Sequence, residues 1–127
     1  MAVEYKLVER INPLRREEPK KFYAQVKSTG EITLKKLGKE IALGSMVSDT
    51  DVLAVLNDLT KALARHLSEG HIVRLGDFGS FQISLSSKGV ESPEKFNASV
   101  MKNPKIIFRP GVDLREMLAT LKYEKGE

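Results

Sequence analysis

Residues 70–81 read Gly70-His71-Ile72-Val73-Arg74-Leu75-Gly76-Asp77-Phe78-Gly79-Ser80-Phe81, and this stretch decides the fold. The β-branched pair Ile72-Val73 precedes a turn-forming segment bracketed by Gly76 and Gly79, and a second run of alternating apolar and polar residues follows from Phe81 to Leu85. Two short apolar runs around such a turn predict a β-hairpin. We expect the later apolar run 105–108 to return and pair with it, which gives a three-stranded antiparallel sheet.

The composition limits the classes of protein to which this chain can belong. The chain has 127 residues, of which 41% are hydrophobic and 30% charged, as in a globular domain with a modest core. No apolar run reaches the length of a membrane span and no leader-like segment opens the chain, so we expect a cytoplasmic protein. Without cysteine the chain has neither disulfides nor thiolate metal sites. Residues 71–111 carry six basic and three acidic side chains, a mild indication of a surface that faces a polyanion.

Two helices are predicted before the hairpin. Thr33 can cap the first, which should end near Gly44 with this glycine in a left-handed conformation. Ser48 and Asp51 have the spacing of a capping box and open the second helix, which should stop at Gly70. One face of the second helix carries an apolar stripe at helical spacing: Val52, Val55, Leu56, Leu59, Leu63 and Leu67.

The two ends of the chain flank this unit. Residues 1–32 form an N-terminal extension with two strand-like runs, Val3 to Val8 and Phe22 to Lys27, separated by a loop over residues 12–19. Residues 33–123 form the main domain. After the break at 109–111 a short helix begins at Val112 and continues to Leu121, and residues 124–127 should be frayed.

So thin a monomer has more apolar side chains than it can bury. Phenylalanines of the sheet and leucines of the long helix would remain exposed, so we expect an isologous homodimer. The residues assigned to the dimer core are Leu59, Leu63, Phe78, Phe81 and Phe108.

Two motifs in this order resemble the HU/IHF family of bacterial histone-like proteins. They are Gly76-Asp77-Phe78-Gly79-Ser80-Phe81 and, further along, Phe108-Arg109-Pro110-Gly111 followed by a helix. The resemblance covers about residues 33–122, and the N-terminal extension is similar to variants found in Bacteroidetes-type bacteria. It implies an α+β fold with a helical hairpin, a sheet and a short C-terminal helix, in an intertwined dimer whose two β-arms reach around the DNA minor groove.

The sheet face opposite Phe81 should then contact DNA. Strand alternation places Arg74, Gln82 and Ser84 on this polar face, and the family resemblance adds Lys105 and Arg109 beside the return strand. Arm lysines and a proline that could act as a wedge complete the predicted DNA-binding set: Lys88, Pro93, Lys95 and Lys102.

The segment from Gln82 to Ile107 departs from the family pattern. Its centre is Glu91-Ser92-Pro93-Glu94-Lys95-Phe96, it contains no arginine, and the usual Arg-Asn-Pro tip is missing. Two conformations remain open. The segment extends as an arm with Pro93 exposed, or part of it forms a short helix that folds back through Phe96 and Val100.

The sequence contains few signs of metal binding or catalysis. His66 and His71 have no cysteine or clustered carboxylate in sequence to complete a metal site, so they are interpreted as structural. No nucleotide-binding or nucleophile motif occurs, so an enzyme, a cofactor, a small-molecule substrate and a metal are not expected. The main hypothesis is a nucleoid-associated protein that binds and bends double-stranded DNA with low sequence specificity. The alternative is an HU-like structural or protein-interaction module with weak or no DNA binding.

Overall fold

The computed structural model describes residues 1–11, 13–15 and 17–126, and the expected loop residues Asn12 and Arg16 and the terminal Glu127 lie outside these ranges. The chain is of the mixed α+β class, as predicted, and divides into two compact units. One unit is formed by residues 34–116 and the other by residues 1–33 with 117–127. No helix among the described residues is both long and apolar enough to cross a membrane.

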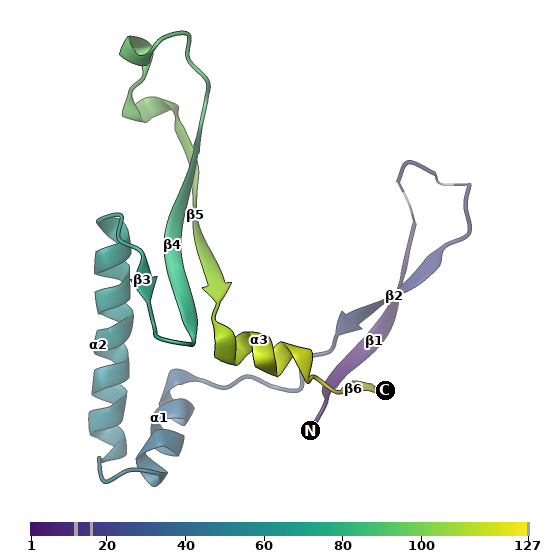
Figure 1. Ribbon diagram of the computed structural model, residues 1–127. Coiled ribbons are helices and arrows are strands. Elements are labelled where there is room, and N and C mark those ends of the chain that lie inside the picture. Colours follow the sequence, from purple (N-terminus) through teal and green to yellow (C-terminus); the bar gives the residue numbers. More distant parts are fainter. Residues whose placement is uncertain (12, 16, 127) are drawn as a thin grey trace. The chain divides into compact units, whose positions relative to one another are not determined.

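Two helices begin the unit of residues 34–116. Helix α1 (Leu34–Leu43) starts directly after Thr33, and α2 (Asp49–Ser68) starts after Ser48 (Figure 1). The predicted cap of α2 is confirmed, because the Ser48 hydroxyl oxygen accepts a hydrogen bond from the Asp51 backbone N–H at 3.2 Å. The helices approach closely at Gly38, which is buried against the backbone and Cβ of Leu53.

The helices end in two different ways. The left-handed conformation expected at Gly44 is wrong, since that residue does not have a positive φ, and α1 ends in a tight turn in which Gly44 N–H donates to the Ile41 carbonyl at 3.1 Å. Gly70, in contrast, has φ +84°. Gly70 N–H donates to the Leu67 carbonyl at 3.0 Å and His71 N–H to the His66 carbonyl at 3.1 Å, which is the Schellman arrangement.

A three-stranded antiparallel sheet in the order β3-β4-β5 follows. Strand β3 (Val73–Arg74) is shorter than the predicted run because Leu75 already belongs to the turn. Leu75 N–H donates to the Gly79 carbonyl at 2.9 Å and Phe78 N–H to the Leu75 carbonyl at 3.0 Å, with φ +52° at Gly76. Glycine suits this position because a positive φ costs it no steric energy.

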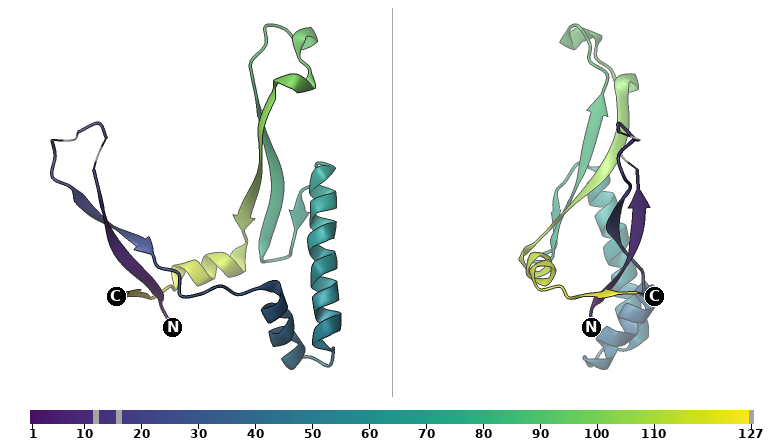
Figure 2. Two further views of the ribbon diagram at one scale, coloured as in Figure 1. Left: turned by 180° about the vertical axis from the view of Figure 1, so that it is seen from behind. Right: turned by 90° about the vertical axis from the view of Figure 1, so that its right-hand side faces the viewer.

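Strands β4 (Gly79–Ser87) and β5 (Met101–Pro110) form a long hairpin whose end lies beyond α1 and α2 (Figures 1 and 2). Two short 3₁₀ turns occupy this end, η1 (Pro93–Lys95) and η2 (Ala98–Val100). The strand pairing thus continues as far as Ser87 and Met101, and a short helical turn is present at Pro93. The Phe96 side chain is 40% exposed at this tip.

The start of β4 requires glycine. Gly79 is buried with φ +155°, and a Cβ there would lie 2.6 Å from the Arg109 carbonyl oxygen and 2.7 Å from two ring carbons of Phe108. Gly111 is similar, since a Cβ would overlap the backbone carbonyl of Asp77. The turn before β4 and the start of α3 (Val112–Ala119) thus approach too closely for side chains, and Gly111 N–H donates to the Phe78 carbonyl at 2.8 Å.

We therefore expect Gly79→Ala to destabilise the protein by about 1–3 kcal/mol, because the added methyl group must displace backbone and ring atoms. The matched control is Gly89→Ala, since a Cβ at Gly89 would meet nothing within 4 Å. Chemical denaturation of both variants at one protein concentration measures the difference. Equal midpoints would contradict the close approach.

The other unit contains a second sheet in the order β2-β1-β6. Strands β1 (Val3–Arg10) and β2 (Lys21–Val26) confirm the two predicted strands and pair antiparallel. Strand β6 (Tyr123–Lys125) pairs parallel with β1, so the prediction of a frayed end is wrong for Glu124 and Lys125. Gly126 N–H also donates to the Tyr5 carbonyl at 2.8 Å, which extends the pairing beyond the strand.

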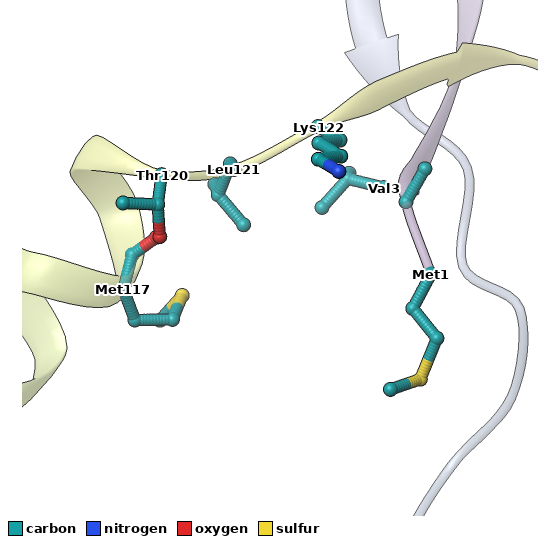
Figure 3. Close-up of a pocket in the computed structure, with 7 residues that line it drawn as sticks. Met1, Val3, Met117, Thr120, Leu121 and Lys122 are labelled. Carbon is teal, nitrogen blue, oxygen red and sulfur yellow. The ribbon is translucent and has the colours of Figure 1, made fainter.

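The segment before β6 departs from its expected helix. Helix α3 ends at Ala119, and the predicted helical residue Leu121 lies in a turn after it. A hollow of about 400 Å³ opens here, between the first residues of the chain and the segment that follows α3 (Figure 3). Its lining residues are Met1, Ala2, Val3, Met117, Thr120, Leu121 and Lys122.

Candidate nucleic-acid interface

A row of polar residues crosses the sheet β3-β4-β5 at its base. Arg74 lies opposite Ser80, and Ser80 lies opposite Arg109. Residues directly opposite one another share a face, so both arginines lie on the same face, about 10 Å apart across three strands. No ion pair between either arginine and an acidic side chain is found among the described residues.

The same face continues along the hairpin. Gln82 and Ser84 follow Ser80 at period two, and Lys105 lies directly opposite Ser84. The predicted grouping of Arg74, Gln82 and Ser84 with Lys105 and Arg109 on one polar face therefore agrees with the strand register.

A β-bulge brings a further lysine to this face. Ser84 pairs with Lys105 and Ser86 with Lys102, so β5 has one more residue than β4 over this interval. Simple alternation would place Lys102 and Lys105 on opposite faces, whereas the bulge aligns both with polar serines. Asn103 within the bulge has φ +47°, a conformation that asparagine adopts more readily than most residues.

The base of the face forms a hollow of about 330 Å³ that contains three arginines. Arg115 of α3 joins Arg74 and Arg109 there, and its Nε donates to the Gly111 carbonyl at 3.4 Å. The remaining lining residues are small, apolar or uncharged: Ile72, Gly76, Gly79, Ser80, Gln82, Pro110 and Gly111. Sequence reasoning missed Arg115, because it lies on a helix that comes after the sheet and its position depends on the tight turn at Gly111.

The tip of the hairpin holds the other predicted DNA-binding residues. Lys88 N–H donates to the Val100 carbonyl at 3.0 Å, which closes the ladder before the tip. Pro93 is exposed as the first residue of η1. The Lys95 ammonium lies 2.8 Å from a carboxylate oxygen of Glu91, so part of the positive charge of the tip is already neutralised.

The opposite face of the sheet carries a cluster of phenylalanines. Phe81 and Phe108 are directly paired with ring centroids 4.7 Å apart, and Phe78 lies 5.6 Å from Phe108. Despite this packing Phe78 is 46% exposed and Phe108 37%. On α2, Leu59 is 41% exposed and Leu63 is half-buried. Val52 and Leu67 are the only buried large apolar residues among the described residues, and both keep a small exposed fraction.

Two helices, an antiparallel sheet with a long hairpin, and a short helix that follows β5 define an HU-like domain. The chain belongs to the family described as HU domain fused to wHTH, Ig, or Glycine-rich motif, whose family model matches residues 1–125. The predicted resemblance to HU proteins is thereby confirmed. The matched residues include the N-terminal extension and β6.

Two solved structures have a similar fold. A protein of Bacteroides vulgatus named as a candidate bacterial DNA-binding protein matches 98% of this chain with a TM-score of 0.67 and 14% identity. The chain spans 48% of that protein. An HU protein of Anabaena crystallised with DNA matches 70% of the chain and 99% of its own length, with a TM-score of 0.55 and 21% identity. No curated protein is a significant match.

Proposed function

We propose that this protein is an architectural DNA-binding protein that contacts the backbone of duplex DNA through the polar face of the sheet β3-β4-β5. The observation that carries the proposal is the hollow in which Arg74, Arg109 and Arg115 converge. Three guanidinium groups around one depression repel one another, and a phosphate bound among them relieves that repulsion. Arginine also fits phosphate oxygens with two parallel hydrogen bonds. The proposed role is binding rather than catalysis.

Low sequence specificity is consistent with the residues on this face. Arginine, lysine and serine side chains contact phosphates regardless of base sequence, and such contacts position a protein on DNA without reading it. The proposed contacts are Arg74, Gln82, Ser84, Lys102, Lys105, Arg109 and Arg115, together with Lys88 and Lys95 near the tip. The Anabaena relative crystallised with DNA supports this choice of ligand.

A homodimer is part of the proposal, because the unit of residues 34–116 leaves apolar side chains of the sheet and of α2 half-exposed. Phe78 is 46% exposed, Phe108 37% and Leu59 41%. These side chains supply an apolar surface that a second copy would cover.

DNA bending would come from the hairpin tip. Pro93 is exposed at the end of a hairpin that extends beyond the body of its unit, and apolar wedges of this kind unstack a base step and kink the duplex. Bending and condensation of this sort suit a nucleoid-associated protein in the cytoplasm.

The test is a titration of random-sequence duplex DNA at several salt concentrations. We expect micromolar or tighter binding at low salt. A plot of the logarithm of the binding constant against the logarithm of the salt concentration should have a slope of about −0.9 for each phosphate contact. Energy transfer between dyes at the two duplex ends then measures bending. No binding at low salt would refute the proposal.

The ion pair at the tip makes a separate prediction. Glu91→Gln frees Lys95 and removes a negative charge, whereas Glu94→Gln removes only the charge, since no ion pair of Glu94 is found in the described part of the chain. We expect both changes to strengthen DNA binding and Glu91→Gln to do so more, by about 2- to 5-fold at low salt. Identical affinities for the two variants would show that Lys95 does not contact DNA.

A second candidate function is an HU-like protein-interaction module. It is favoured by β2, where Phe22 is 67% exposed, Tyr23 46% and Val26 69%, in a unit that the DNA proposal does not use. If this function dominates, Arg74→Ala with Arg109→Ala will leave partner capture intact while DNA is not recovered from the wild-type protein.

A further inference from the structure

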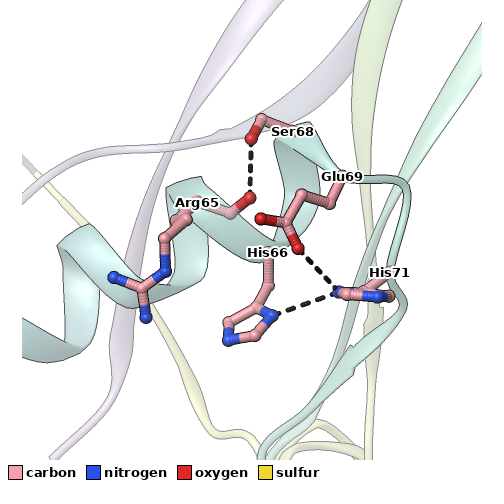
Figure 4. Close-up of polar contacts among 5 residues, drawn as sticks. All are labelled: Arg65, His66, Ser68, Glu69 and His71. Atoms are coloured by element: carbon pink, nitrogen blue, oxygen red, sulfur yellow. Dashed lines mark hydrogen bonds and ion pairs between the residues drawn. The ribbon is translucent and has the colours of Figure 1, made fainter.

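Two histidines and a glutamate meet at the end of α2, on a feature that the proposed DNA binding does not use. His66 and His71 bring their Nδ1 atoms to 3.1 Å from each other, and a carboxylate oxygen of Glu69 lies 3.7 Å from His71 Nδ1 (Figure 4). One donor atom from each of the three side chains lies within 4.8 Å of the others. The sequence interpretation of an incomplete site thus missed Glu69, which is itself the C-cap residue of the helix.

The helix cap explains why these side chains meet. In a Schellman motif the chain turns back so that the residue after the glycine lies beside the residue three positions before the cap, and an apolar contact commonly joins the two. Here Gly70 has φ +84°, and the positions brought together are His71 and His66. Imidazoles therefore occupy both positions of the usual apolar contact. The hydrogen bond from His71 N–H to the His66 carbonyl keeps the backbones of these two residues close together.

We propose that His66 Nδ1, His71 Nδ1 and the Glu69 carboxylate bind a divalent transition-metal ion of the zinc type, with water at the remaining positions. Nitrogen atoms that share a tetrahedral zinc at 2.0–2.1 Å lie about 3.3 Å apart, close to the observed separation of the two Nδ1 atoms. Two imidazoles and one carboxylate are a donor set that transition metals accept.

The electrostatic setting favours a cation. The carbonyl groups of the last turn of α2 carry partial negative charge at this end of the helix. Arg65 is adjacent to His66 in the sequence, and its guanidinium points away from the histidine pair in Figure 4. His71 and Glu69 have side chains 57% and 54% exposed, so both can make the small rotation that closes the site. A bound ion would join α2 to the segment that leads into β3 and Arg74.

The experiment is calorimetric titration of the untagged protein with Zn²⁺ at pH 7.5, with Mg²⁺ as the comparison ion. Because the chain has two histidines and no cysteine, no other imidazole or thiolate competes. We expect one Zn²⁺ per chain, no heat with Mg²⁺, and a higher melting temperature with Zn²⁺. His66→Ala and His71→Ala should each abolish binding. Glu69→Gln should weaken it by more than the roughly 10-fold that loss of an outer hydrogen-bond partner costs.

The matched control is Asp58→Asn, which removes another exposed carboxylate of α2. This variant should bind Zn²⁺ like the wild type. Three results would each overturn the proposal. They are Zn²⁺ binding that survives both histidine substitutions, a stoichiometry of one ion per two chains, and no binding at millimolar Zn²⁺. A histidine variant that fails to fold is identified by circular dichroism, and His66→Gln and His71→Gln then replace it with side chains of similar size.

Discussion

Replacement of Arg74 and Arg109 by alanine is expected to weaken the binding of random-sequence duplex DNA by about 100- to 1000-fold near 0.1 M salt. The two side chains lie on one face of the sheet and line the same hollow, where no ion pair with an acidic side chain satisfies them among the described residues. In a homodimer the double substitution removes four guanidinium groups from the proposed interface. Affinity measured by fluorescence anisotropy at low protein concentration tests this expectation.

The salt dependence of DNA binding by the same variant distinguishes the loss of specific phosphate contacts from a general loss of positive charge. Each phosphate contact contributes about −0.9 to the logarithmic slope, so four lost contacts should make the slope less negative by about 3 to 4 units. The matched control is Arg10→Ala with Arg15→Ala, which removes the same charge from the other unit. In the wild type Arg10 lies over the Tyr23 ring and Arg15 pairs with Glu18 at 3.0 Å.

The control variant should lose far less affinity, with a slope change below about 1 unit. Equal losses in the two variants would mean that overall charge, rather than the sheet face, sets the affinity. Arg74→Lys with Arg109→Lys refines the test: it keeps the charge and loses bidentate geometry, so the slope should persist while affinity falls modestly.

The sequence predicted the elements of the HU-like unit because their signals are local. Ser48 caps α2, Gly70 ends it, and Gly76 with Gly79 brackets the turn before β4, each for reasons that a short window of sequence contains. Period-two alternation likewise assigned Arg74 and Gln82 to the polar face of their own strands, and the pairing of Arg74 with Ser80 puts the two residues on one face.

The features that sequence reasoning missed depend on contacts between distant segments. Strand β6 forms because Tyr123–Lys125 meets β1 at the other end of the chain, and three residues alone give no strand signal. The bulge that aligns Lys102 with Ser86 is set by pairing across the hairpin. Arg115 reaches the hollow only because Gly111 allows α3 to start directly against the turn at Asp77.

A charge placed on the apolar face of α2 is expected to have a large effect on dimerisation. Leu59 is 41% exposed in the single chain although it belongs to the apolar stripe of the helix. A half-exposed leucine contributes little to the fold of one chain, so Leu59→Glu should leave the monomer folded. In an isologous interface each copy would bury a carboxylate, at several kcal/mol per charge. We expect the dissociation constant of the dimer to rise by at least about 1000-fold.

Sedimentation velocity over a range of protein concentrations measures this change. The matched control is Asn57→Glu, which adds the same charge to α2 on the side away from the stripe and should remain dimeric. Because a monomer presents half of the proposed DNA-binding surface, Leu59→Glu should also bind DNA more weakly, with a slope about half that of the wild type. Two results would contradict the proposed dimer. One is a wild-type protein that sediments as a monomer at every concentration, and the other is a Leu59→Glu variant that dimerises as strongly as its control.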